Sequence, residues 1–208
     1  MVFVKICGIT NLEDALFATR AGADALGFNF YKRSPRYIAP TDARNIVKQL
    51  PDSTMSVGVF VNEGNPESVE RIADEVGLKA VQLHGDESPE YCRALKDRFV
   101  IKALRVGEGF DLQSVKEFEA DAILIDAFAG DVRGGTGRTV DWNIARKVSE
   151  LVPKLFLAGG LSPENVSEAL SLVKPFAIDA CSSLENVPGR KDAKRVRAFI
   201  KAAREARP

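Results

Sequence analysis

The 208-residue sequence contains a single histidine, His84, and no excess of charge of either sign. Lysine plus arginine equals aspartate plus glutamate, 29 of each, so the net charge is zero. A chain without a basic excess gives no electrostatic reason to expect a nucleic-acid partner or a membrane surface. One histidine also cannot build the His-rich site of a metal-dependent barrel epimerase or hydrolase, so we expect no metal site.

Long apolar runs are missing as well. No run approaches the roughly 20 residues that cross a bilayer, and the start, MVFVKICG, lacks the parts of a signal peptide. The three cysteines, Cys7, Cys92 and Cys181, are an odd number at scattered positions. This pattern argues against a disulfide framework and predicts a reducing, cytoplasmic location.

The chain does contain a regular alternation of two kinds of segment. Short apolar runs with strand character lie at 2–6, 24–30, 55–61, 78–83, 99–104, 121–126, 153–158 and 175–180. Segments with apolar residues at helical spacing separate them. Strict alternation implies a parallel sheet, and eight such units predict a compact α/β fold, a single-domain (β/α)8 TIM barrel over residues 1–208. The alternative is an open doubly wound sheet, but no G-x-G-x-x-G follows the first run.

Helix ends can also be predicted. Thr10 and Glu13 have capping-box spacing, and two glycines, Gly22 and Gly77, stand where helices should end. Three pairs have the form of an N-cap followed by proline at the first helical position; these are Asn65-Pro66, Ser88-Pro89 and Ser162-Pro163.

Titratable side chains fall at the ends of four predicted strands. Because the active site of such a barrel lies at the carboxyl ends of its strands, we expect Cys7, His84, Asp126 and Asp179 to meet on one rim. Asp126 and Asp179 stand far from the next helices, so capping explains them poorly, and they are candidate functional carboxylates. The lone His84 is a candidate positioning or structural group, and we place it among the expected substrate-binding residues.

Cys7 stands just before Gly8 and the start of a helix, where backbone N–H groups favour a thiolate. Lys5 lies two residues earlier and therefore on the same strand face, where a cation would also lower the thiol pKa. The alternative is an inert buried thiol. Cys92 is expected to be a packing residue, and Cys181 has no predicted catalytic role.

Glycine-rich loops follow the last three predicted strands. Gly159 and Gly160 follow the seventh strand, Ser182 and Ser183 follow the eighth, and RGGTGRT, with Gly134 and Gly135, follows the sixth. Phosphate sites in barrels are often built from the loops after strands seven and eight, so these loops predict a small phosphorylated ligand. Each glycine pair alone is also typical of a tight turn.

Arg36, in the loop after the second strand, has two interpretations. It is either part of a solvated basic loop or a clamp for a substrate carboxylate, which a guanidinium binds in bidentate fashion.

These segments together resemble the phosphoribosylanthranilate isomerase family of tryptophan biosynthesis. The resemblance covers nearly the whole chain and rests on VKICGIT, ADALGFNF, SPRYI, VGVFVN, VQLHG, GGTGRTVDW, AGGLSPENV and PGRKD. It implies a (β/α)8 barrel, no cofactor, and an Amadori rearrangement of an aminoaldose to an aminoketose. It also implies Cys7 as general base, Asp126 as general acid and Arg36 as the partner of the anthranilate carboxylate, with the loops around Gly159, Gly160 and Ser182 holding the phosphate.

One segment departs from the pattern of that family, which usually reads DVSSGVE where this chain reads DACSSLE. Cys181 thus replaces a serine and Ser183 a glycine. If that glycine serves a positive φ, Ser183 is strained or the loop is rearranged.

Other functions stay open at this point. An indole-glycerol-phosphate synthase would use a strand-end lysine such as Lys102, and a pentose-phosphate epimerase would need metal ligands. A barrel could also bind phosphosugars without turnover, although binding alone needs neither Cys7 nor Asp126. The related aminoaldose of histidine biosynthesis is a further candidate substrate, and the chain is expected to be a monomer or homodimer.

Overall fold

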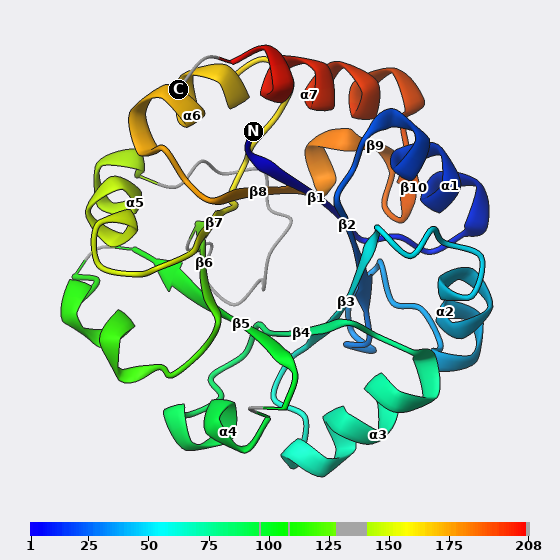
Figure 1. Cartoon of the computed structure of the whole chain (residues 1–208), viewed down its shortest axis with the longest axis horizontal. Helices are drawn as coiled ribbons and strands as arrows, with labels where there is room; N and C mark the ends of the chain where they lie inside the picture. The colour runs from blue at the N-terminus through cyan, green and yellow to red at the C-terminus, as the bar shows by residue number, and fades with distance from the viewer. Residues whose placement is uncertain (96, 108, 128–140, 207–208) are drawn as a thin grey trace.

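The computed structural model describes residues 1–95, 97–107, 109–127 and 141–206. Eight parallel strands close into a barrel in chain order, and helices surround it as an outer ring (Figure 1). The strands are β1 (Phe3–Cys7), β2 (Ala25–Asn29), β3 (Met55–Phe60), β4 (Ala80–Leu83), β5 (Phe99–Val106), β6 (Ala122–Ala127), β7 (Leu155–Leu157) and β8 (Ala177–Ala180). The predicted (β/α)8 barrel is confirmed, and the open sheet is wrong.

The described helices alternate with these strands. They are α1 (Leu12–Ala21), α2 (Pro40–Val47), α3 (Pro66–Val76), α4 (Pro89–Ala94), α5 (Trp142–Ser149), α6 (Val166–Val173) and α7 (Ala193–Glu205). A 3-10 helix, η1 (Leu112–Glu117), follows β5, and a second, η2 (Ser182–Leu184), leads into a small hairpin of β9 (Glu185–Val187) and β10 (Arg190–Lys191). Within the described part of the chain, none of the helices is both long and apolar enough to cross a membrane.

Four of the predicted helix ends are confirmed. The side chains of Asn65 and Ser88 accept hydrogen bonds from backbone N–H groups in the first turns of α3 and α4, each followed by proline. Gly22 and Gly77 end α1 and α3 with φ of 104° and 79°, the left-handed conformation that glycine adopts without strain.

Two predicted caps are wrong. Asn11, not Thr10, caps α1 by accepting from the N–H of Asp14, while the Thr10 hydroxyl donates to the carbonyl of Gly189. Ser162 begins a turn rather than α6, because the Asn165 side chain accepts from its N–H and the helix begins only at Val166. At the start of α1 both Thr10 and Asn11 suit the cap, and the bond of Thr10 to Gly189 leaves the cap to Asn11.

The side chains inside the barrel change from apolar to polar along the barrel axis. Its lower part is an apolar cluster in which aromatic and aliphatic side chains pack between the strands, formed by Ala25, Val57, Ala80, Ile101, Ala103, Ala122, Leu124, Phe156, Ala158 and Ala177. Nearer the carboxyl ends of the strands, the inward positions carry buried polar groups instead, among them Lys5, Gln82, Asp126 and Asp179. Burying such groups is costly unless they are paired, so this end of the barrel is where function is expected.

Lys102 does not reach this polar end. Its neighbour Ile101 belongs to the cluster inside the barrel, and since strand side chains alternate, Lys102 faces the outer shell. Its ammonium forms a buried ion pair with Glu87 (2.7 Å) and donates to the carbonyl of Gly85 (2.9 Å). Lys102 therefore supports the loop after β4, and the role of catalytic lysine considered for it is wrong.

Candidate active site

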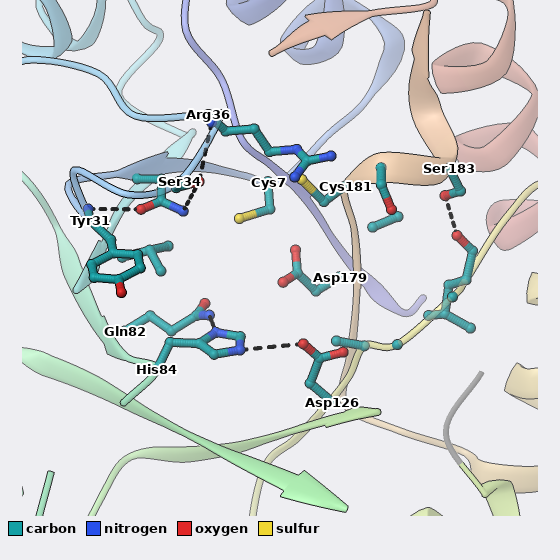
Figure 2. A pocket seen from close by; sticks show the side chains of 18 of the residues that line it. Cys7, Tyr31, Ser34, Arg36, Gln82, His84, Asp126, Asp179, Cys181 and Ser183 are labelled. Carbon is teal, nitrogen blue, oxygen red and sulfur yellow. Dashed lines mark hydrogen bonds and ion pairs between the residues drawn. The ribbon is translucent and has the colours of Figure 1, made fainter. Parts of the chain in front are cut away.

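A pocket opens at the carboxyl ends of the strands, and the predicted residues line it (Figure 2). Among its lining residues are Cys7, Arg36, His84, Asp126, Asp179, Gly159, Gly160, Ser182 and Ser183. The fold thus brings together side chains from β1, β6, β8 and four loops. Gly134 and Gly135 lie outside the described residues, so their predicted role stays a prediction.

Cys7 is the last residue of β1, and its side chain fills the space left by the missing side chain of Gly27. Gly27 stands opposite it on β2, and a Cβ at Gly27 would lie 2.7 Å from the Cys7 sulfur, closer than real contacts allow. The pKa of Cys7 lies well below the ordinary thiol value. The largest cause is a hydrogen bond from Cys181. Burial raises the pKa of Cys7, but the interactions with Lys5, Lys191 and His84 lower it further and outweigh burial.

Lys5 and Asp179 form an ion pair inside the barrel, with 2.8 Å between the ammonium and one carboxylate oxygen. Burial disfavours the charge on Lys5, yet Asp179 and Cys7 outweigh it and raise the pKa of Lys5. Burial raises the pKa of Asp179 to about 6 against the influence of Lys5. The second oxygen of Asp179 is buried, and within the described structure it has no hydrogen-bond partner. It is therefore available to a ligand in the pocket.

His84 links two strands across the pocket. One ring nitrogen, Nε2, lies 3.3 Å from a carboxylate oxygen of Asp126. The other, Nδ1, lies 2.8 Å from the amide nitrogen of Gln82, two residues earlier on the same face. Figure 2 shows this chain of three side chains along one side of the pocket. The contact with Gln82 fixes the orientation of the ring, and Nε2 then faces the Asp126 carboxylate at ion-pair distance.

Arg36 is held from behind by a buried carboxylate. Glu185 accepts hydrogen bonds from Nε (3.0 Å) and Nη2 (2.7 Å) of the guanidinium. Lys191 donates to the same carboxylate (2.9 Å), and both cations keep its pKa low although burial opposes this. Arg36 is thus a fixed, nearly buried group of the pocket wall, and the solvated basic loop is the wrong interpretation.

The loops after β7 and β8 face each other at the edge of the pocket. Gly159 and Gly160 have φ of 82° and 65°, which side-chain-bearing residues rarely adopt. Ser183 does not take a positive φ; it lies in η2, and its hydroxyl donates to the carbonyl of Leu161. The serine that replaces the usual glycine is therefore unstrained, and it ties the two loops together.

Several residues of the site escaped sequence reasoning. Gln82 carried a signal, because its spacing from His84 places both on one strand face. Glu185 and Lys191 carried none, because only the hairpin of β9 and β10 brings them behind Arg36. Cys181 had been left without a role, yet it has the largest influence on the pKa of Cys7.

Fold and pocket define a (β/α)8 barrel with a low-pKa thiol and a carboxyl group at the carboxyl ends of its strands. Comparison with known proteins then identifies the family. The family model for N-(5'-phosphoribosyl)anthranilate isomerase matches residues 4–202. The chain belongs to this family, whose members are aldose–ketose isomerases of tryptophan biosynthesis.

Individual relatives agree with this assignment. The N-(5'-phosphoribosyl)anthranilate isomerase of Trichlorobacter lovleyi is 49% identical over 99% of this chain and 100% of its own. The crystal structure of the phosphoribosyl anthranilate isomerase of Thermotoga maritima is 48% identical, with a TM-score of 0.91 over 98% of this chain and 99% of its own. A further solved structure, at 46% identity and a TM-score of 0.87 over 98% and 99%, is a complex with reduced 1-(o-carboxyphenylamino)-1-deoxyribulose 5-phosphate.

Proposed function

We propose that this pocket rearranges N-(5-phosphoribosyl)anthranilate to 1-(2-carboxyphenylamino)-1-deoxyribulose 5-phosphate, with Asp126 as general acid and Cys7 as general base. The observation that carries the proposal is the placement of the two groups. A thiol of lowered pKa and a carboxyl group line the same pocket from opposite sides, with Asp179 between them (Figure 2). A proton donor and a proton acceptor that reach the same bound sugar are what the reaction requires.

The reaction has two proton transfers at different atoms. Asp126 donates a proton to the ribose ring oxygen, which opens the ring and leaves an iminium at C1. The iminium makes the proton at C2 acidic, and the Cys7 thiolate removes it to give an enolamine. Protonation at C1 and loss of the enol proton then complete the ketose. Cys7 acts as a base in this scheme and forms no covalent bond to the substrate.

Three groups orient the substrate in this scheme. The free oxygen of Asp179 accepts a hydrogen bond from a sugar hydroxyl, since it is a buried acceptor in need of a donor. His84 holds the Asp126 carboxyl at the ring oxygen. Gln82 in turn holds His84 by its contact with Nδ1.

The phosphate is assigned to the other end of the pocket, between Gly159, Gly160, Ser182 and Ser183. Two consecutive glycines at positive φ let backbone N–H groups approach an anion closely. The first backbone N–H groups of η2 have no carbonyl partner within that helix, so they too can donate hydrogen bonds to a phosphate. Gly134 and Gly135, outside the described residues, stay a proposed addition to this site.

Arg36→Met should raise the KM for phosphoribosylanthranilate about 10- to 100-fold with a smaller effect on kcat, because a charged hydrogen bond to the anthranilate carboxylate is worth about 1.5–3 kcal/mol. Glu185 keeps Lys191 as a partner in this variant, so the pocket wall should hold. Steady-state kinetics of Arg36→Met beside Arg33→Met, an exposed arginine of the same loop, measure the effect. A fall in kcat at unchanged KM would remove Arg36 from substrate binding.

The proposed function is tested by adding the purified protein, without metal or cofactor, to freshly made phosphoribosylanthranilate. We expect its anthranilate fluorescence to disappear faster than by spontaneous decay, with the rearranged ketose as product by mass spectrometry. A folded sample that binds the substrate and does not accelerate the loss would contradict the proposal. The expected monomer or homodimer and the cytoplasmic location stay predictions.

A further inference from the structure

Cys7 and Cys181 each follow directly on the last paired residues of two adjacent strands, β1 and β8. β1 and β8 run parallel, with Lys5 opposite Asp179 and Ile6 opposite Ala180. The next positions in this register are Cys7 and Cys181. Cys7 shares the inward face of β1 with Lys5, two residues earlier. Cys181 lies just past the end of β8, and both cysteines line the same pocket. Neighbouring strands lie about 4.8 Å apart, within the Cα separation of roughly 4.4–6.8 Å that a disulfide requires.

The Cys181 sulfur lies close to the backbone that follows Cys7. The interaction of the Cys181 thiol with Cys7 is the largest cause of the lowered pKa of Cys7 and of the raised pKa of Cys181. A Cβ at Gly8, the residue after Cys7, would lie only 2.8 Å from the Cys181 sulfur. Figure 2 shows both cysteines on the Arg36 side of the pocket, which both of them line. A small molecule that enters the pocket therefore meets both thiols. Cys92, the third cysteine, is buried in α4 and does not line the pocket.

The two thiols differ in reactivity. The hydrogen bond from Cys181, helped by nearby cations, lowers the pKa of Cys7 and favours its thiolate. The same bond and burial raise the pKa of Cys181, whose thiol also lies 3.9 Å from a carboxylate oxygen of Glu185. One nucleophilic sulfur beside one protonated sulfur is the arrangement in which an oxidised cysteine is captured by a resolving partner.

We propose that Cys7 and Cys181 form a reversible disulfide when the protein meets a hydroperoxide. The Cys7 thiolate attacks the terminal peroxide oxygen; the O–O bond breaks, Cys7 becomes a sulfenic acid, and hydroxide leaves from hydrogen peroxide or an alkoxide from an organic hydroperoxide. The Cys181 sulfur then attacks the Cys7 sulfur, the S–O bond breaks, and water leaves with the Cys181 proton. Cysteine sulfur has been oxidised by two electrons and the peroxide reduced by two. A dithiol reverses the step by exchange.

The link has a consequence for turnover. A disulfide removes the thiolate of Cys7, so the general base assigned above is lost until the bond is reduced; this consequence, unlike the link itself, rests on the proposed function. The disulfide is available in this chain because Cys181 stands where the family usually has serine. The link also spares Cys7 from further, irreversible oxidation.

The experiment exposes the purified, reduced protein to hydrogen peroxide at neutral pH and measures intact mass, free thiols and turnover. We expect the mass to fall by two hydrogen atoms, one of three thiols to remain titratable, and turnover to be lost and then restored by dithiothreitol. Proteolytic peptides from the oxidised sample should be joined through Cys7 and Cys181. Because mass and peptides report the link without reference to activity, a link formed with full turnover would contradict the role of Cys7 and not the disulfide.

Two variants make the test decisive. Cys181→Ser, which restores the residue usual in the family, should give no cross-link; Cys7 should instead gain oxygen atoms, and its turnover should not return with dithiothreitol. Cys92→Ser should oxidise and recover like the wild type. The proposal is overturned if wild-type Cys7 gains oxygen without a cross-link, if Cys92 takes part in the link, or if Cys181→Ser recovers as fully as the wild type.

Discussion

Cys7→Ala should lower kcat for phosphoribosylanthranilate by about 10²–10⁴-fold, the usual contribution of a positioned general base, and leave KM nearly unchanged. Alanine removes the only group at this position that can accept the C2 proton, while Lys5, Asp179 and Gly27 keep their own contacts. Steady-state kinetics, together with the dissociation constant of a product analogue, separate a loss of turnover from a loss of binding.

The matched control is Cys92→Ala, which removes a thiol outside the pocket. Burial raises the pKa of Cys92 to about 11, so this cysteine is a neutral packing group at neutral pH. The control should turn over like the wild type if it folds, as circular dichroism would establish. Near-wild-type turnover of Cys7→Ala would take Cys7 out of the role of general base.

The pH dependence of kcat is an independent test of Cys7 as the general base. A base must be deprotonated to act, so kcat should fall as the pH drops through the pKa of Cys7. Because the hydrogen bond from Cys181 and the nearby cations lower that pKa, the fall should occur below the ordinary thiol value of about 8.5.

Asp126→Asn should have an effect of similar size, about 10²–10⁴-fold in kcat, because the amide cannot donate a proton to the ring oxygen. The substitution keeps the shape of the side chain and a polar atom for His84, which lies 3.3 Å from the carboxylate. Substrate binding should therefore survive. Asp42→Asn, the same chemical change at an exposed position of α2, is the control and should leave kcat unaltered.

Deuterium at C2 of the substrate distinguishes the two roles. When the base is missing, removal of the C2 proton becomes slower, so the kinetic isotope effect should grow in Cys7→Ala. When the acid is missing, ring opening becomes limiting, so the isotope effect should shrink in Asp126→Asn. The opposite assignment of acid and base would exchange the two results.

Much of this site could be predicted from sequence because of the way a barrel is built. Eight apolar runs alternating with helical segments specify parallel strands, and parallel strands have their carboxyl ends on one side. Cys7, Asp126 and Asp179 stand at such ends, so the topology alone places them together. The loops with Gly159, Gly160 and Ser182 follow from the same rule.

The hydrogen-bond partners of polar side chains at helix starts and in loops were harder to predict from the sequence. Thr10 and Asn11 both suit a helix start, and the free energies of the two caps differ by no more than the roughly 1 kcal/mol that a cap is worth. The contact of Thr10 with Gly189, far along the chain, decides between them. Ser183 shows the same limit: its sequence position suggested strain, while its hydroxyl found the carbonyl of Leu161.

The sequence by itself determined the barrel, its active end and the residues that face it, because hydrophobic periodicity and strand order are properties of the chain. Only the tertiary structure decided how those residues act on one another. Closure of the barrel pairs β1 with β8, which joins Lys5 to Asp179 across 174 positions and brings Cys181 against Cys7. A pKa is set by neighbours within a few ångströms, and strand register, which no local pattern specifies, selects those neighbours.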